Sequence, residues 1–213
     1  MKIVRLLLLS GIIIVAVAWF SASTPSEKKA GLPTSRKETR SSYLNKTMEK
    51  LEQKAADAKK FAEKKGFNET TCFLIDMSLA SGQKRFFIYD LKKDSIQAAG
   101  PVAHGNCFEY WLEGRKYSNV VGSGCTSLGK YKIGTSYTGK WGYSYKLHGL
   151  DSTNSNAFER TVVLHSHSCV PETGTTDEIC QSNGCPTVSP EMLLKLKAII
   201  NNSKKPLLLW IYD

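Results

Sequence analysis

The hydrophobic pattern of the chain changes near residue 70, and this change limits the folds that the chain can adopt. From residue 72 onward, apolar residues gather in short runs rich in aromatic and β-branched side chains, as is typical of β-strands. The runs span residues 72–79, 84–91, 96–104, 130–135, 142–148, 161–165 and 206–212. Ser189, Pro190 and Glu191 form the start of a late helix, which we expect to end near Asn201. We therefore predict a mainly β domain over residues 70–213 with a late α-helix.

A helical pattern precedes this domain. Apolar residues recur at steps of three and four, at Leu44, Met48, Leu51, Ala55, Ala58 and Ala62. Gly66 follows as a candidate C-cap. We predict a basic helical segment over residues 43–66, which either packs on the domain through its alanines or serves as a charged spacer. Residues 24–42 are rich in Ser, Thr, Lys and Pro, so we expect a flexible linker there.

The first residues are typical of an export signal. Lys2 and Arg5 precede an apolar run over residues 6–20, and the small residues 21–23 follow it. The run is shorter than the roughly 20 residues that a membrane span needs. Residues 1–23 are therefore expected to be a cleaved signal peptide, with an uncleaved membrane anchor as the alternative. Either way we expect an exported protein of the periplasm or cell envelope, attached to the inner membrane if the anchor is kept.

The positive charge is concentrated before the domain. Of the formal net charge of +10, residues 1–70 contribute 14 Lys and Arg against 7 Asp and Glu. A nucleic-acid-binding protein would instead carry its basic residues on a folded module, so we expect no nucleic-acid partner. The sequence makes no prediction of oligomeric state.

Six cysteines in an exported chain are expected to include disulfides. The nearest pairs in sequence are Cys169 with Cys180 and Cys107 with Cys125. Two such bridges, one buried thiol and one catalytic thiol would account for all six, although spacing alone does not establish the connectivity.

The residues that carry chemistry lie between Thr161 and Ser189. His165 ends an apolar strand, and Ser182-Asn183-Gly184-Cys185 follows about twenty residues later on a turn into the late helix. A thiol nucleophile needs a neighbouring base and donors for the oxyanion that forms at the attacked carbonyl. This pattern suggests a cysteine enzyme, although Cys185 might by itself equally be half of a disulfide in an exported protein.

The same segment resembles the YkuD-type L,D-transpeptidase motif, which is a histidine, a spacer and Ser-x-Gly-Cys. Residues 72–213 as a whole are similar to the YkuD_2 branch, the murein L,D-transpeptidase catalytic-domain-like proteins. The matching pieces stand in order: Asp76 in FLIDMSLASGQKRFFIYDL, VAHG (102–105), YSN (117–119), TSLGKY (126–131), YTGKWGYSYKLHGL (137–150), VVLH (162–165) and SNGCPTVSPE (182–191). The resemblance implies an L,D-transpeptidase-like β-sandwich or barrel.

The resemblance also implies a mechanism, that of a cysteine acyltransferase without cofactor or metal. Cys185 would attack a peptidoglycan stem tetrapeptide, release its terminal D-alanine and form a thioester, which an amine of a second stem resolves into a 3–3 cross-link. His165 would be the base, and the carbonyl of Ser166 would orient its ring. The amides of Gly184 and Cys185 would be oxyanion donors, and Ser182 would support the turn.

The resemblance implies a further set of substrate-binding residues: Ser182, Asn183, His104, Tyr117, Ser118 and Asn119. His104 has the alternative of a structural histidine at a strand end, and loop packing explains residues 117–119 as well. A zinc site formed by two histidines with Cys169 and Cys180 has none of the common finger spacings, so no metal is expected.

The chain departs from the family pattern at two positions. Asn183 stands where the branch usually has tryptophan, and Gln181 stands where it usually has arginine. If that arginine holds a substrate carboxylate, substrate binding would differ here.

Two alternatives remain open. His167 is a rival base, because its distance along the chain to Cys185 also fits the wider family. The thioester, if formed, might also be resolved by water, which would make the protein an L,D-carboxypeptidase or endopeptidase, and a non-catalytic peptidoglycan-binding module is the third reading.

Overall fold

The computed structural model describes residues 34–213. Its elements are α1 (Thr34–Lys65), β1 (Thr71–Asp76), β2 (Phe86–Asp90), β3 (Ser95–Gly100), β4 (Val102–Ala103), β5 (Gly129–Gly139), β6 (Gly142–Gly149), the short 3₁₀ helix η1 (Ser152–Asn154), β7 (Val163–Ser166), β8 (Thr187–Val188), α2 (Pro190–Asn202) and β9 (Leu208–Tyr212). The expected export signal at residues 1–23 lies outside the described residues. Across residues 34–213, none of the helices combines the length and apolar character needed to cross a membrane.

The strands form one sheet that curls back on itself. Within the described chain the order is β3-β2-β1-β9-β5-β6-β7-β8-β4. The pairs β1–β9 and β7–β8 are parallel, whereas the others are antiparallel. Only Pro101 separates β3 from β4, although these strands stand at opposite ends of the order. The sheet must therefore bend round until its two edges meet, as the predicted β-sandwich or barrel requires.

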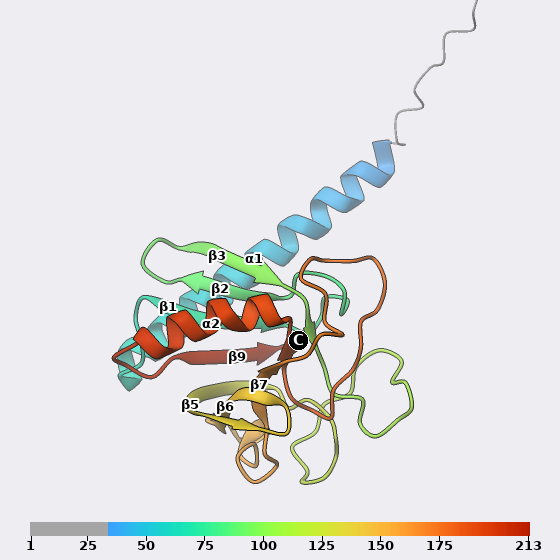
Figure 1. Ribbon diagram of the computed structural model, residues 1–213. Helices are drawn as coiled ribbons and strands as arrows, with labels where there is room; N and C mark the ends of the chain where they lie inside the picture. Colours follow the sequence, from blue (N-terminus) through green and yellow to red (C-terminus); the bar gives the residue numbers. More distant parts are fainter. Residues whose placement is uncertain (1–33) are drawn as a thin grey trace, which may run out of the picture. The chain divides into compact units, whose positions relative to one another are not determined.

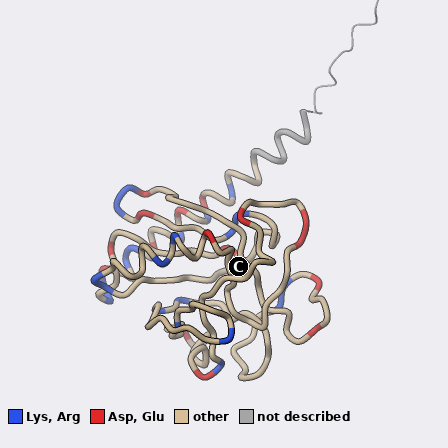
Figure 2. Tube along the Cα trace, viewed as in Figure 1, with Lys and Arg blue, Asp and Glu red and all other residues tan. Residues whose placement is uncertain are grey.

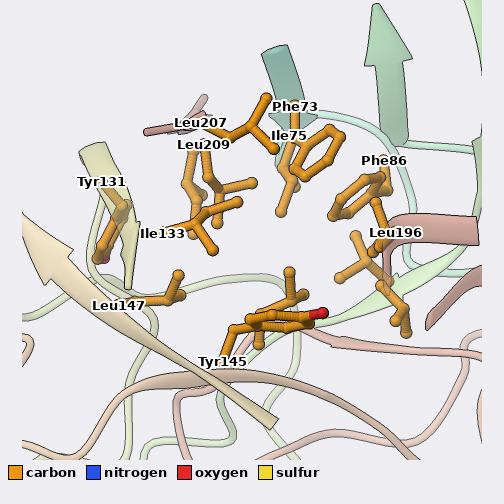
Figure 3. Close-up of a cluster of buried hydrophobic side chains, with 14 of the residues drawn as sticks. Phe73, Ile75, Phe86, Tyr131, Ile133, Tyr145, Leu147, Leu196, Leu207 and Leu209 are labelled. Atoms are coloured by element: carbon orange, nitrogen blue, oxygen red, sulfur yellow. The ribbon is translucent and has the colours of Figure 1, made fainter. Parts of the chain in front are cut away.

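Both faces of the sheet are covered by apolar side chains, which explains why the strands do not alternate strictly between apolar and polar residues. In β1, Phe73 and Ile75 point into a core shared with α2, and Leu74 points into a second core shared with α1. Figure 3 shows the first core, in which side chains from β1, β2, β5, β6 and β9 meet Leu196 of α2. The two helices thus cover opposite sides of the same sheet (Figure 1).

The helix α1 packs on the sheet through its small side chains. Leu51, Ala55, Ala58 and Ala62 are almost fully buried. Lys50 also places its ammonium 3.1 Å from the carboxylate of Asp76, which is 1% exposed. Of the two roles considered for this segment, packing on the domain is therefore the one observed.

This helix begins earlier than expected. It starts at Thr34 rather than at residue 43, so the part of the predicted linker from residue 34 to residue 42 is helical. The reason is visible in the sequence, because this stretch holds helix-forming Arg, Lys and Glu residues and no Pro or Gly.

Other local predictions are confirmed with one shift. Ser189 caps α2 by accepting a hydrogen bond from the amide of Met192, with Pro190 in the first turn. Gly139 is not in a turn but ends β5, paired with Gly142. Lys140 and Trp141 therefore form the tip of the β5–β6 hairpin.

The cysteines pair as the nearest-neighbour expectation proposed. Cys107 is bonded to Cys125, and Cys169 is bonded to Cys180. Cys72 and Cys185 are free, and Cys72 is fully buried on β1. The charges of this part of the chain are interspersed, with Lys and Arg near Asp and Glu along the same loops and helices (Figure 2).

Truncation of Leu51 tests whether α1 is part of the stable fold. Leu51→Ala removes a buried side chain and should lower the free energy of unfolding by about 2–4 kcal/mol, because it leaves a cavity between helix and sheet. Leu44→Ala, on the same helix but 52% exposed, should change it by less than about 0.5 kcal/mol. Equal effects of the two substitutions in urea denaturation would contradict the packing described here.

Candidate active site

The expected catalytic residues meet in one pocket of about 410 Å³. Its lining includes Cys185, His165 and His167, together with Ser182 and Asn183 of the motif. Both cysteines of the Cys169–Cys180 bridge also line it, so this disulfide forms part of the pocket wall.

The turn that carries Cys185 is held by the Ser182 hydroxyl. Its oxygen accepts a hydrogen bond from the amide of Gly184 at 3.2 Å and donates to the carbonyl of Cys185 at 2.7 Å. Gly184 has φ +109°, and a Cβ there would lie 2.8 Å from the carbonyl oxygen of Cys125. Glycine is therefore required at this position both for its backbone conformation and for its close contact with the neighbouring loop.

The two amides expected to bind the oxyanion are not equivalent. The amide of Gly184 is already engaged by Ser182. Among the described residues, no hydrogen-bond acceptor is found for the amide of Cys185. Of the two, the Cys185 amide is the one available to a bound carbonyl.

The Cys185 thiol rests against the backbone of the strand that carries the histidine. Its sulfur accepts a hydrogen bond from the amide of Val163 at 3.5 Å and lies 4.0 Å from the carbonyl oxygen of Thr161. Burial raises the pKa of this thiol, and the Val163 amide and the charge of Arg160 partly offset the rise. Within the described chain no hydrogen bond joins the sulfur to His165, so attack requires the side chain to rotate.

His165 is buried on β7 and has a directional partner at each ring nitrogen. Nδ1 lies 3.2 Å from the carbonyl oxygen of Ser166, and Nε2 lies 2.9 Å from the hydroxyl of Thr187. Burial lowers the pKa of His165, and His167 lowers it further, while Ser166 acts in the opposite direction. The ring is therefore neutral near pH 7 and can accept a proton.

His167 occupies a different environment. It is exposed, its Nδ1 accepts a hydrogen bond from the amide of Cys169 at 3.1 Å, and its own amide donates to Val188. His167 lines the same pocket, but its ring helps to shape the loop that leads into the disulfide.

The remaining expected substrate residues divide into two groups. Ser182 and the exposed Asn183 line the pocket. His104 lies outside the lining, 1% exposed, with Nδ1 2.9 Å from a guanidinium nitrogen of Arg85. Burial, followed by the charge of Arg85, lowers the pKa of His104 to about 4. This is the environment of the structural histidine that was the alternative.

Residues 117–119 also lie outside the pocket lining. Tyr117 bridges to Thr126, and the amide nitrogen of the Asn119 side chain donates to the carbonyl of Ser152. The carbonyl of Ser118 accepts from Arg160 at 2.7 Å. Their contacts support the loop beside the pocket rather than reach into it.

Four lining residues were not singled out from the sequence. They are Lys140, Trp141, Arg160 and Thr187. Trp141 stacks on His165 with 5.6 Å between ring centroids, and Arg160 donates to the carbonyl of Cys125 beside Gly184. Trp141 and Arg160 fall in or beside quoted motifs, which was the available signal, but only the fold shows that they face Cys185.

Gln181 has a role that arginine cannot fill. Its side-chain nitrogen donates to the carbonyl of Leu112 at 2.8 Å, and its oxygen accepts from the amide of Leu112 at 3.0 Å. Arginine has no acceptor and cannot make this pair. The departure from the family pattern thus pins the loop around Leu112 to the pocket wall.

Alkylation should distinguish the two free thiols. Iodoacetamide should add one mass, at Cys185, because burial raises the pKa of Cys72 to about 12 and closes it from solvent. The raised pKa of Cys185 means that its thiolate forms only at higher pH, so the labelling rate should rise with a midpoint above about 8.5. Comparable labelling of Cys72 in the folded protein, or a midpoint well below that value, would contradict this environment.

Solved structures with similar folds are L,D-transpeptidases. An enzyme from Mycobacterium smegmatis is 9% identical with a TM-score of 0.39, over 68% of this chain and 59% of that one. One from Xylanimonas cellulosilytica is 16% identical with a TM-score of 0.38, over 72% and 68%. The helical cell shape determining protein Pgp2 (K307A mutant) from Campylobacter jejuni is 11% identical with a TM-score of 0.43, over 68% and 47%.

The match to a family of sequences is more extensive. No curated protein matches the chain. The family model described as the L,D-transpeptidase catalytic domain, YkuD_2, matches residues 42–212. This span covers most of the chain and includes the pocket with Cys185 and His165. The chain therefore belongs to the YkuD_2 family of L,D-transpeptidase catalytic domains, which are enzymes that modify peptidoglycan.

Proposed function

We propose that the protein is a peptidoglycan L,D-transpeptidase that forms a thioester at Cys185 and transfers the acyl group to an amine. The observation that carries this proposal is the placement of a free thiol and a neutral, oriented imidazole in the same pocket. A carbonyl on one ring nitrogen of His165 leaves the other able to accept a proton, which is the arrangement that activates a thiol.

The charge of the pocket supports a substrate with free carboxylates. Lys140 and Arg160 line it, and among the described residues no Asp or Glu does. A stem tetrapeptide ends in the carboxylate of D-alanine, so its binding would be favoured by these positive charges. Trp141 and the Cys169–Cys180 bridge would shield the reacting atoms from water on the two sides of the pocket.

The chemical steps follow from the geometry. The Cys185 side chain turns away from Val163, and its proton passes to Nε2 of His165. The thiolate attacks the carbonyl of the third stem residue, and the Cys185 amide donates to the oxyanion. The imidazolium then protonates the leaving amine of D-alanine. In the second half, His165 takes the proton of the incoming amine, and the Cys185 thiolate leaves.

Two disulfides support an oxidising compartment. We therefore infer that the domain works in the periplasm or cell envelope, exported through the segment before residue 24. Whether that segment remains as an inner-membrane anchor is the second part of the inference.

Analysis of muropeptides tests the reaction. A protein of residues 24–213, incubated with purified tetrapeptide muropeptides, should produce 3–3 dimers and free D-alanine, whereas Cys185→Ala should produce neither. Mass spectrometry separates the outcomes: tripeptides without dimers would show that water resolves the thioester, and an unchanged pool with binding retained would contradict catalysis altogether.

Substitution of the two histidines tests the choice of base. His165→Gln should slow acylation of Cys185 by a carbapenem by about 10²–10⁴-fold, the usual contribution of a general base. His167→Gln, the matched control in the same pocket, should slow it by less than about tenfold. The reverse order of effects, measured from the rate at which the protein gains the mass of the carbapenem, would make His167 the base.

A further inference from the structure

Thr187 lies beside the catalytic histidine because of the strand pairing. It is the first residue of β8 and is the parallel partner of His165 on β7. On its other side it pairs with Ala103 of β4. With strands on both sides and 3% of its surface exposed, Thr187 has a fixed backbone and a buried hydroxyl that needs hydrogen-bond partners.

The hydroxyl has two such partners. Its oxygen lies 2.9 Å from Nε2 of His165 and 3.3 Å from the carbonyl oxygen of Cys185. A carbonyl only accepts, so the 3.2 Å contact between Nδ1 and Ser166 assigns the proton of the neutral ring to Nδ1. Nε2 is then an acceptor, and the Thr187 hydroxyl donates to it.

The second partner connects the histidine to the turn of the nucleophile. The carbonyl of Cys185 also accepts from the hydroxyl of Ser182 at 2.7 Å, and Ser182 in turn accepts from the amide of Gly184. Thr187 is thus the side chain that contacts both the ring of His165 and the backbone of Cys185. A merely structural threonine would need only the carbonyl.

We propose that Thr187 is a positioning residue that satisfies Nε2 of His165 in both of its protonation states. The inference rests on the proposed function, in which His165 is the base. In the resting state the hydroxyl donates to Nε2 and holds the ring. When the S–H bond of Cys185 breaks and an N–H bond forms at Nε2, the hydroxyl rotates to donate to the carbonyl of Cys185. Its oxygen then accepts the new N–H.

The effect of removing the hydroxyl has a definite sign. A hydrogen bond from a charged donor is roughly twice as strong as one between neutral groups, so the imidazolium loses more than the imidazole does. The pKa of His165, already lowered by burial, should fall further in Thr187→Val. The charged or titratable groups around the ring are Lys140, Arg160, His167 and Cys185 in the pocket, and Glu172 and Glu191 at the start of α2. None of these changes in the variant.

The test compares Thr187→Val, which keeps the β-branched shape, with Thr187→Ser, which keeps the hydroxyl. In the full-length protein with ¹⁵N-labelled histidine, wild type and Thr187→Ser should show His165 protonated at Nδ1. Thr187→Val should show a mixture of tautomers and a downward shift of the His165 titration. Carbapenem acylation of Cys185 should slow about tenfold in Thr187→Val and recover to within about threefold of wild type in Thr187→Ser.

Thr153→Val is the matched control, because the Thr153 hydroxyl donates to the carbonyl of Leu128 outside the pocket lining. It should leave both readouts unchanged. An unchanged tautomer and titration in Thr187→Val would overturn the proposal. If wild type is never acylated, the proposed function fails, but the tautomer measurement still decides the role of Thr187.

Discussion

The parallel pairing of β7 with β8 is the contact on which the active site depends. It sets His165 opposite Thr187 and Ser166 opposite Val188, and so joins two segments that are separated by the long loop from residue 167 to residue 186. Because β8 also pairs with β4, it is an interior strand with little freedom to slip. Its neighbours in the chain are Cys185 before it and the capped start of α2 after it. The nucleophile is thus placed by a strand and a helix rather than by a free loop.

The second constraint is the close approach of the nucleophile turn to a cross-linked loop. Gly184 lies against the carbonyl of Cys125, and Arg160 donates to that same carbonyl. The Cys107–Cys125 bridge ties down this loop, and the Cys169–Cys180 bridge ties down the opposite wall. A cavity built from irregular segments is held in shape by these covalent links, which fits a domain working where disulfides persist.

Much of this arrangement is predictable from the sequence, for reasons that are local. Short runs of β-branched residues and the Ser189-Pro190 start identify the strands and α2, and the spacing of the cysteines suggests both bridges. What the sequence does not reveal is register. A strand as short as β8 carries no periodicity, so the contact of Thr187 with His165 was missed. The end of β5 at Gly139 moved Trp141 to the hairpin tip, where it stacks on His165. His104 has a motif signal but is buried against Arg85, because a motif records neighbours in the chain and not what faces a cavity.

The most direct test of the central claim is to isolate the acyl-enzyme. The protein would be mixed with a synthetic stem tetrapeptide, quenched in acid, digested and analysed by mass spectrometry. The account predicts that the fragment containing Cys185 carries the tetrapeptide less its terminal D-alanine, and that hydroxylamine removes this group as it does a thioester. Release of D-alanine by Cys185→Ala, or an adduct on any other residue, would contradict the account.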